Sequence, residues 1–328
     1  MADNSAIEWT DATWNPIRAR NKKTGKVGWF CTHKSEGCRN CYAETWNMRL
    51  GTGLPYKPGH LADVEIFLDR KMLEVPLRWK RPRNIFTLSM SDLFGEFIEP
   101  AWVREIFDVM VRTPQHTYQV LTKREDRMHD QMHELWDVPP PNVWLGVSIE
   151  DQTSADERIP VLLRTPAVVR FLSCEPLLGP IDLASPYTES EFNRLVRTEA
   201  PWARGSDTAL PGITWVIVGG ESGDAARPMH PAWVRDLRDQ CAAAGVHFFF
   251  KQWGEWEPRE QWSGHLGGGR FEPMVAIMPD GAEVPHDVVP QDVGGCRFAR
   301  VGKRKAGRLL DGIEHNEVPI VVTGRIEA

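Results

Sequence analysis

The sequence lacks any long apolar run, and this absence excludes the simplest kind of membrane protein. No stretch of its 328 residues approaches the ~20 consecutive apolar residues that a membrane-spanning helix needs. The first residues are polar and lack the apolar stretch of a secretory signal peptide. We therefore expect a cytoplasmic protein that has no membrane as a partner.

The sequence also has no excess of positive charge. Its 39 lysines and arginines are outnumbered by 45 aspartates and glutamates, which gives a net charge of −6. The whole molecule is therefore not a basic nucleic-acid binder, although local basic clusters occur. Each cluster is either a solvated face or a phosphate contact beside an active site. The clusters comprise Arg18, Arg20, Lys22, Lys23 and Lys26; Arg78, Lys80, Arg81 and Arg83; and Lys303, Arg304, Lys305 and Arg308.

Cysteine is scarce, with six residues in all. In a reducing compartment so few cysteines do not indicate a disulfide framework. Three of them, Cys31, Cys38 and Cys41, lie within eleven residues of the chain, whereas the other three are scattered. This clustering indicates a metal or iron–sulfur site.

Short apolar segments recur along the chain and predict buried parallel strands. They cover residues 85–90, 117–122, 142–148, 168–173, 214–219 and 246–251, and an earlier one at 27–31 leads into the cysteines. Amphipathic helical patterns lie between them, for example at 101–111 and 233–241.

This alternation predicts an α/β fold, a partial or full (β/α) barrel with loop insertions, although a doubly wound open sheet fits the same rhythm. We expect residues 1–256 to form the barrel and residues 257–328 an irregular extension packed on it. A polar insertion is expected at about 184–212, a glycine run lies at 267–269, and residues 301–312 suggest a short basic helix.

Polar residues follow nearly every predicted strand. In parallel α/β folds ligands bind at the carboxyl ends of the strands, so a shared polar site is expected there. Glycines after the strand at 214–219 permit a close backbone approach or simply a tight turn, and Glu221 could accept from an ammonium group. The predicted cofactor-binding residues are Asp92, Ser148, Glu150, Ser173, Glu175, Gly219, Gly220 and Glu221, with Lys123 as a further candidate for substrate or cofactor.

The cysteine cluster allows more than one chemistry. Thiolates are soft ligands that suit iron–sulfur clusters and zinc. A cubane held by Cys31, Cys38 and Cys41 leaves one iron open, and S-adenosylmethionine could bind there through its amino and carboxylate groups. Zinc with His33 as a fourth ligand is the rival interpretation, and three unliganded thiols are another.

Residues 37–43 resemble the cysteine motif of radical S-adenosylmethionine enzymes, especially those similar to spore photoproduct lyase. Over nearly the whole chain the sequence resembles a phage-associated family of unknown function, sometimes called three-Cys-motif proteins. The resemblance implies a [4Fe–4S] cluster, S-adenosylmethionine as cofactor, an electron donor, and a radical S-adenosylmethionine type of barrel. The matching segments are residues 7–16, 37–43, 91–94, 121–124, 144–148, 173–177, 218–223, 249–254 and 307–312.

Two features depart from that pattern. Six residues separate Cys31 from Cys38, whereas three are usual in radical S-adenosylmethionine enzymes. In radical S-adenosylmethionine enzymes the Gly-Gly-Glu that binds the methionyl amine normally follows the second strand, whereas residues 219–221 follow a later one. Asp92, at the second or third strand, is the alternative candidate by position.

The leading hypothesis is an enzyme that generates a 5′-deoxyadenosyl radical and modifies a nucleic acid or a nucleotide. The alternatives are a zinc-stabilised, non-catalytic nucleic-acid-binding or phage accessory protein, and a barrel that acts as a scaffold for a phage-encoded partner. Catalytic residues beyond the cofactor contacts are not indicated.

Overall fold

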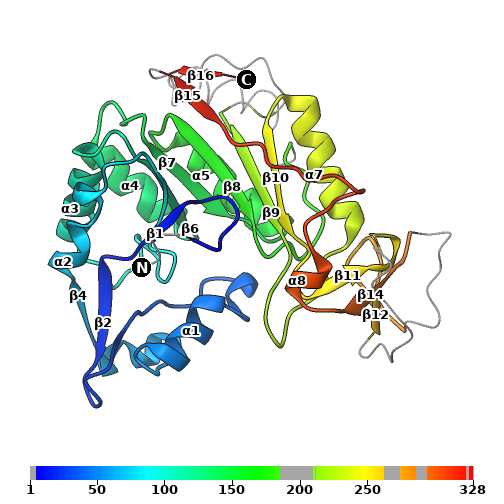
Figure 1. Ribbon diagram of the computed structural model, residues 1–328, viewed down its shortest axis with the longest axis horizontal. Helices are drawn as coiled ribbons and strands as arrows, with labels where there is room; N and C mark the ends of the chain where they lie inside the picture. The colour runs from blue at the N-terminus through cyan, green and yellow to red at the C-terminus, as the bar shows by residue number, and fades with distance from the viewer. Residues whose placement is uncertain are drawn as a thin grey trace.

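The computed structural model describes residues 5–184, 210, 212–261, 274–285, 294–322 and 325–327. Its centre is a seven-stranded sheet in which every neighbouring pair of strands is parallel (Figure 1). The strand order follows the chain order, as expected when each crossover is a helix or loop of the same hand. The strands are β1 (Ala12–Trp14), β5 (Asn84–Thr87), β6 (Thr117–Thr122), β7 (Val143–Ser148), β8 (Val169–Cys174), β9 (Trp215–Gly219) and β10 (His247–Gln252).

The sheet curls into a half-barrel and does not close. The outer strands β1 and β10 each pair with one neighbour among the described residues, so both edges stay open. The partial (β/α) barrel is therefore confirmed, and full closure is wrong. The α/β class is confirmed with it.

Among the described residues the helices cover one face of the sheet only, which is not a doubly wound arrangement. Side chains from α3 (Pro100–Val111), α4 (Glu125–Leu135), α5 (Gln152–Arg164) and α7 (Pro231–Ala244) share one core with the sheet. The opposite face carries a separate aromatic cluster to which none of these helices contributes. Its buried members are Trp9, Phe86, Trp144, Val169, Phe171, Trp215, Ile217 and Phe249.

The two faces follow from alternation along the strands. In β7 the side chain of Leu145 joins the helix-side core, and that of Trp144 joins the aromatic cluster. The same alternation places Leu172 and Phe171 of β8 on opposite faces. Aromatic side chains therefore fill the base of the half-barrel, and polar residues occupy its carboxyl-end rim.

The prediction that a first barrel strand at 27–31 leads into the cysteines is wrong. The strand there, β3 (Val27–Gly28), has two residues and pairs antiparallel with β2 (Ile17–Asn21). Strand β2 also pairs with β4 (Val64–Leu68), and the three form a small separate sheet. The first barrel strand is β1, whose three residues are too few for a period-two pattern to show.

The C-terminal part adds a four-stranded antiparallel sheet. Its order is β11 (Trp256–Pro258), β14 (Cys296–Arg300), β12 (Met274–Ile277) and β13 (Glu283–Val284). The predicted domain boundary after residue 256 falls within β11, and the division into two domains stays a prediction. The basic helix is shorter than expected and spans α8 (Lys303–Ala306). The glycine run at 267–269 and most of the insertion at 184–212 lie outside the described residues.

The end of the chain returns to the barrel edge. Asn316 forms an isolated bridge with Phe249 of β10, and the Glu317 carboxylate accepts from the Phe248 amide. These contacts satisfy polar groups of an edge strand. Strands β15 (Ile320–Val322) and β16 (Arg325–Glu327) follow.

The remaining helices are short. They are α1 (Tyr42–Leu50), α2 (Arg70–Leu73), and the 3-10 turns η1 (Glu36–Cys38), η2 (Pro58–Asp63), η3 (Pro76–Arg78) and η6 (Arg259–Gln261). Within the described ranges, no helix combines the length and apolar character required for a membrane span.

Candidate functional site

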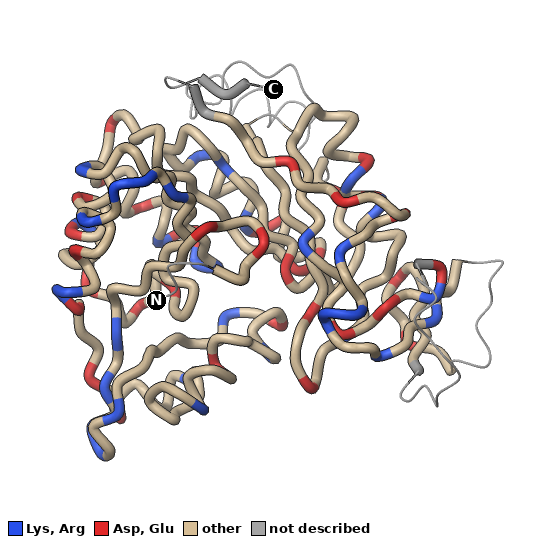
Figure 2. The backbone as a smooth tube through the Cα atoms, viewed as in Figure 1, with Lys and Arg blue, Asp and Glu red and all other residues tan. Residues whose placement is uncertain are grey.

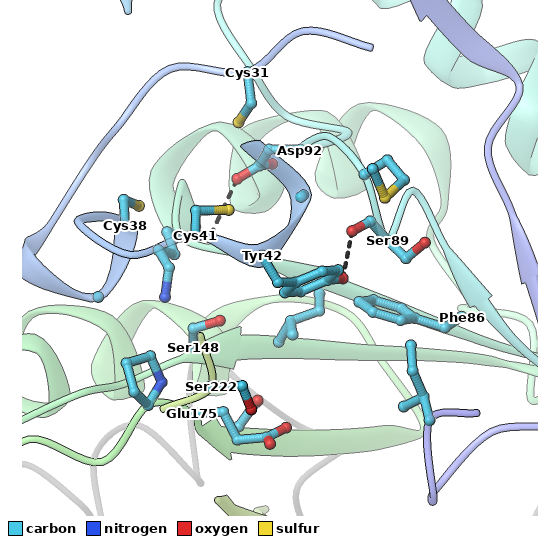
Figure 3. Close-up of a pocket in the computed structure, with 18 of the residues that line it drawn as sticks. Cys31, Cys38, Cys41, Tyr42, Phe86, Ser89, Asp92, Ser148, Glu175 and Ser222 are labelled. Atoms are coloured by element: carbon cyan, nitrogen blue, oxygen red, sulfur yellow. Dashed lines mark hydrogen bonds between the residues drawn. The ribbon is translucent and has the colours of Figure 1, made fainter. Parts of the chain in front are cut away.

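A pocket of about 400 Å³ opens at the carboxyl ends of the barrel strands. Its wall includes all three clustered cysteines, the polar strand ends and part of the aromatic cluster (Figure 3). Of the predicted cofactor-binding residues, those that line it are Asp92, Ser148, Ser173, Glu175, Gly220 and Glu221. Glu150 and Gly219 do not line it.

The three cysteines come from one loop that crosses the rim. Cys31 follows the small sheet, Cys38 ends η1, and Cys41 is the N-cap residue of α1. Figure 3 shows the sulfur of Cys31 directed towards the part of the loop that carries Cys41, and the sulfur of Cys38 directed towards Cys41. The structure therefore brings the three predicted metal ligands to one side of one pocket.

The three cysteines are half-buried, with cations and amide groups near their thiols. Burial raises the pKa of Cys31 above its usual value, and the charge of Asp92 adds to this. Burial also raises the pKa of Cys41, although backbone amides of Ala43 and Glu44 oppose the rise. The Lys34 amide donates to the Cys38 sulfur at 3.5 Å. Amide hydrogen bonds of this kind stabilise ligating thiolates.

His33 does not join the cysteines. Its Nε2 lies 2.7 Å from Oε2 of Glu44, whose other oxygen accepts from the Tyr56 amide. Within the described part of the chain, no three His, Cys, Asp or Glu side chains converge closely enough to hold a single metal ion. The predicted Cys₃His arrangement is therefore not formed in this structure.

Asp92 is held in a buried ion pair beside Cys31. Its carboxylate accepts from Thr122 Oγ1 at 2.7 Å, from the Lys123 and Phe94 amides, and from Arg124 Nη1 at 3.0 Å. Burial alone would lower the pKa of Arg124, but the charges of Asp92, Cys31 and Glu96 outweigh burial and raise it.

Glu150 is buried below the cysteine loop. Its Oε1 accepts from Ser35 Oγ at 2.8 Å and from Lys123 Nζ, and its Oε2 accepts from Arg158 at 2.9 Å. Burial would raise the pKa of Glu150, but Lys123 and Arg158 outweigh it and hold the pKa below its usual value. A Cβ on Gly37 would lie 2.5 Å from this carboxylate, so a larger residue there would require the Glu150 side chain to shift.

Glu221, at the end of β9, accepts from both the loop and a nearby arginine. Its Oε2 accepts from Asn40 Nδ2 at 3.0 Å and from the backbone amide and Nε of Arg227, each at 2.9 Å. Its Oε1 accepts from Arg227 Nη2 at 2.8 Å. Burial would raise the pKa of Glu221, but the hydrogen bonds from Arg227 and Asn40 hold it below its usual value.

Other polar side chains of the pocket have fewer hydrogen-bond partners than these carboxylates. Ser148 and Ser173 are buried, and their hydroxyls have no hydrogen-bond partner among the described residues. Glu175 pairs with Lys251 of β10, with 2.9 Å between Oε1 and Nζ. The intervening strand β9 has Gly219 at that point, where a Cβ would collide with the Glu175 carboxylate. Gly219 therefore serves packing, because it lets a β8 residue and a β10 residue meet across β9.

The far side of the pocket is apolar and includes Trp9, Phe86 and Leu121. Trp9 and Phe86 pack with their ring centroids 4.8 Å apart. Lys303 of α8 also borders the pocket and pairs with Glu8 at 3.2 Å. Figure 2 shows further basic positions at α8.

Sequence reasoning missed several of these residues. Arg124 and Asn40 stand beside predicted site residues and could have been noted for that reason. Arg227 gives no local signal, because its importance depends on the path of the chain after β9. Trp9 lies before the first strand, and only the fold shows that it covers the aromatic face.

Taken together, the fold and the pocket define an α/β half-barrel protein with a cysteine-lined site at the carboxyl ends of its parallel strands. The chain belongs to the family described as "Protein of unknown function (DUF5131)", whose model matches residues 4–319. No curated protein matches it.

A solved structure with some similarity is a spore photoproduct lyase variant determined with a dinucleoside spore photoproduct. The identity is 11%, the match covers 72% of this chain and 71% of that chain, and the TM-score is 0.35. A likeness at this level does not indicate a shared activity.

Proposed function

We propose that this chain is an iron–sulfur enzyme of the radical S-adenosylmethionine type, with Cys31, Cys38 and Cys41 as the ligands of a [4Fe–4S] cluster. The observation that carries the proposal is that these three thiols border one pocket at the strand ends, and no histidine among the described residues lines it. Three thiolates without a fourth protein ligand suit a cubane that keeps one iron open.

The same geometry argues against a structural zinc site. Zinc needs four donors at about 2.0–2.3 Å from one point. No such convergence exists among the residues that the structure describes, and His33 is occupied by Glu44. In a cubane each thiolate binds a different iron, so the sulfurs need not meet at one point.

When bound, the cluster and S-adenosylmethionine would supply a 5′-deoxyadenosyl radical by one-electron cleavage of a carbon–sulfur bond. The chain's own part is to bind and orient. The Ser148 and Ser173 hydroxyls are free to hydrogen-bond a ribose. The Glu175–Lys251 pair offers an acceptor for an ammonium group and a donor for a carboxylate.

The aromatic base contributes by excluding water. Trp9 and Phe86 are almost completely buried, and they close the pocket on the side away from the polar rim. A reactive intermediate formed at the rim is thereby shielded from solvent on that side.

The proposed substrate is a nucleic acid or a nucleotide. Of the three basic clusters in the sequence, the one at α8 reaches the pocket through Lys303, and its neighbours Arg304 and Lys305 are exposed. Half-exposed Trp46 of α1 also borders the pocket and could stack on a base. Cytoplasmic location, a phage association, a phage-encoded partner and a separate electron donor stay predictions.

The test is release of 5′-deoxyadenosine from S-adenosylmethionine by protein reconstituted without oxygen. We expect release that requires a reductant and is lost in Cys38→Ser. Cys241→Ala is the matched control, because Cys241 is buried in α7 and does not line the pocket, so this variant should keep the activity. An iron-loaded protein that releases none would reject the proposal. Salt-sensitive nucleic-acid binding with no need for S-adenosylmethionine would favour the accessory-protein alternative.

A further inference from the structure

The loop that carries the cysteines has little structure of its own. Between Cys31 and Cys41 its regular structure is the single turn η1, with backbone bonds such as Cys38 N to Ser35 O at 2.9 Å. The six residues between the first two cysteines lengthen it. A longer loop has more conformational freedom to lose when its thiols are brought together.

Three hydrogen-bonded anchors tie this loop to three places on the barrel rim. Arg124, at the end of β6 and paired with Asp92, donates to the Thr32 carbonyl at 3.0 Å and also to the Thr32 hydroxyl. Thr32 directly follows Cys31. This first anchor therefore holds the backbone beside the first thiol.

The second anchor lies between the first two cysteines. Ser35 donates to Glu150, just beyond the end of β7, at 2.8 Å. Gly37 lies directly over the same carboxylate, where a Cβ would displace the Glu150 side chain from its present position. The Glu150 carboxylate also accepts hydrogen bonds from Lys123 and Arg158, which fix its position.

The third anchor stands immediately before Cys41. Asn40 donates to Glu221 at 3.0 Å and to the Ala225 carbonyl at 2.8 Å. Arg227, which pairs with the same Glu221, donates to the Glu36 carbonyl at 3.0 Å. Each cysteine therefore has an anchored residue one to three positions away.

The three carboxylates have their oxygens engaged by these anchors and their cations. Both oxygens of Asp92, Glu150 and Glu221 accept from protein donors. A carboxylate offers about four acceptor positions, so little capacity remains for a ligand. This is a different use from the cofactor contacts that the sequence suggested.

We infer that Asp92, Glu150 and Glu221 are positioning residues, which hold the cysteine loop in its cluster-binding shape before any metal arrives. The inference rests on the proposed function. It adds an explanation of how the chain orders a cysteine loop with six residues between Cys31 and Cys38. Preorganisation of this kind lowers the ordering cost that ligand binding would otherwise carry.

The experiment uses the full-length, metal-free protein and measures two properties of the loop. Amide hydrogen exchange reports whether residues 31–41 are ordered, and iodoacetamide alkylation reports whether Cys38 and Cys41 are protected. We expect slow exchange and slow alkylation in the wild-type chain. The double variant Ser35→Ala with Asn40→Ala removes three hydrogen bonds donated by loop side chains, to Glu150, Glu221 and the Ala225 carbonyl. It leaves the carboxylates paired with Arg158 and Arg227. Its loop thiols should react about tenfold faster.

Two comparisons separate positioning from general destabilisation. Arg39→Ala changes an exposed side chain of the same loop whose ion pair lies at the surface, and it should react like the wild type. Asn40→Ala combined with Ser35→Thr keeps one hydroxyl donor and should recover part of the protection. Exchange elsewhere in the chain should not change in any of these variants.

A wild-type loop that exchanges as fast as an unfolded peptide would overturn the inference, as would equal alkylation rates in the wild type and the double variant. The outcome for the cluster is read separately, from iron and sulfide uptake and from the electron paramagnetic resonance signal of the reduced protein. A protected loop in a protein that takes up no iron would reject the proposed function and leave the loop-holding role standing. Iron uptake by a protein whose loop is unprotected would reject the loop-holding role and leave the proposed function standing.

Discussion

At the scale of single residues, the glycines at the end of β9 have a packing reason that does not depend on a cofactor. Gly219, Gly220 and Glu221 resemble an amine-binding turn, yet each has a packing partner inside the protein. A Cβ on Gly219 would collide with Glu175, and one on Gly220 would collide with the carbonyl of Trp253. Close approach of backbone to backbone is reason enough for glycine at residue 220.

Replacement of Gly220 by alanine is expected to destabilise the protein by about 3 kcal/mol, because the obstructing atom is backbone and cannot rotate away. Gly59→Ala is the control, since a Cβ there would meet nothing within 4 Å. The measurement is the free energy of unfolding from urea titration. Equal stability of the two variants would show that the chain relaxes at Gly220 and that the packing explanation fails.

Residue identity at the strand ends was predictable, but the role of each residue was not. Ser148, Ser173 and Glu175 follow apolar strands, and the structure places all three on the pocket wall. Glu150 follows the same kind of strand and does not line the pocket, because Lys123, Arg158 and Ser35 enclose it. Whether a strand-end carboxylate faces a ligand or a neighbouring cation depends on loops far away in sequence.

At the scale of secondary-structure elements, the carboxyl end of helix α5 is hydrogen-bonded by a buried arginine of the neighbouring strand β8. Arg170 of β8 is fully buried, and its Nε and Nη2 donate to the carbonyls of Leu162 and Thr165 at 2.8–3.1 Å. These are carbonyls of the last helical turn and its cap, where backbone donors run out. The Leu162 carbonyl also accepts from the Thr165 amide at 3.1 Å, whereas the Thr165 carbonyl accepts from Arg170 alone among the described residues. A cation there also opposes the negative end of the helix dipole.

Arg170→Met should therefore cost about 2–3 kcal/mol of stability, because it leaves the buried Thr165 carbonyl without a donor and weakens the hydrogen bonding of the Leu162 carbonyl. Arg164→Met, at the same helix end but partly exposed, should stay within about 0.5 kcal/mol of the wild type. Urea unfolding followed by circular dichroism compares the two. A small loss for Arg170→Met would mean that water replaces the guanidinium and that the helix end needs no arginine.

At the scale of the whole molecule, the six strands from β5 to β10 could be predicted from sequence, with the bounds within three residues at every end. Most residues of these strands are buried on both faces, and apolar side chains therefore dominate them, which is a strong signal for a short strand. Strand β1 escaped notice because it has three residues, and the segment at 27–31 was mistaken for it. The C-terminal sheet escaped notice for the same reason, since its strands have two to five residues.

The whole-molecule arrangement also explains why the cysteines reach the barrel rim without a barrel strand before them. The loop enters from the small sheet of β2, β3 and β4 and is bound to the ends of β6, β7 and β9 by side chains. No local pattern in the sequence encodes those contacts, because the partners lie about 90 to 190 residues apart. The clustering of three cysteines could be read from the sequence, and the means of holding them could not.

The most direct test of the account is the metal and sulfide content of the wild-type chain purified without oxygen. We predict about four iron atoms and four acid-labile sulfides per chain. Cys31→Ser should lower both values, and Cys241→Ala should change neither. One zinc per chain with no sulfide would contradict the account.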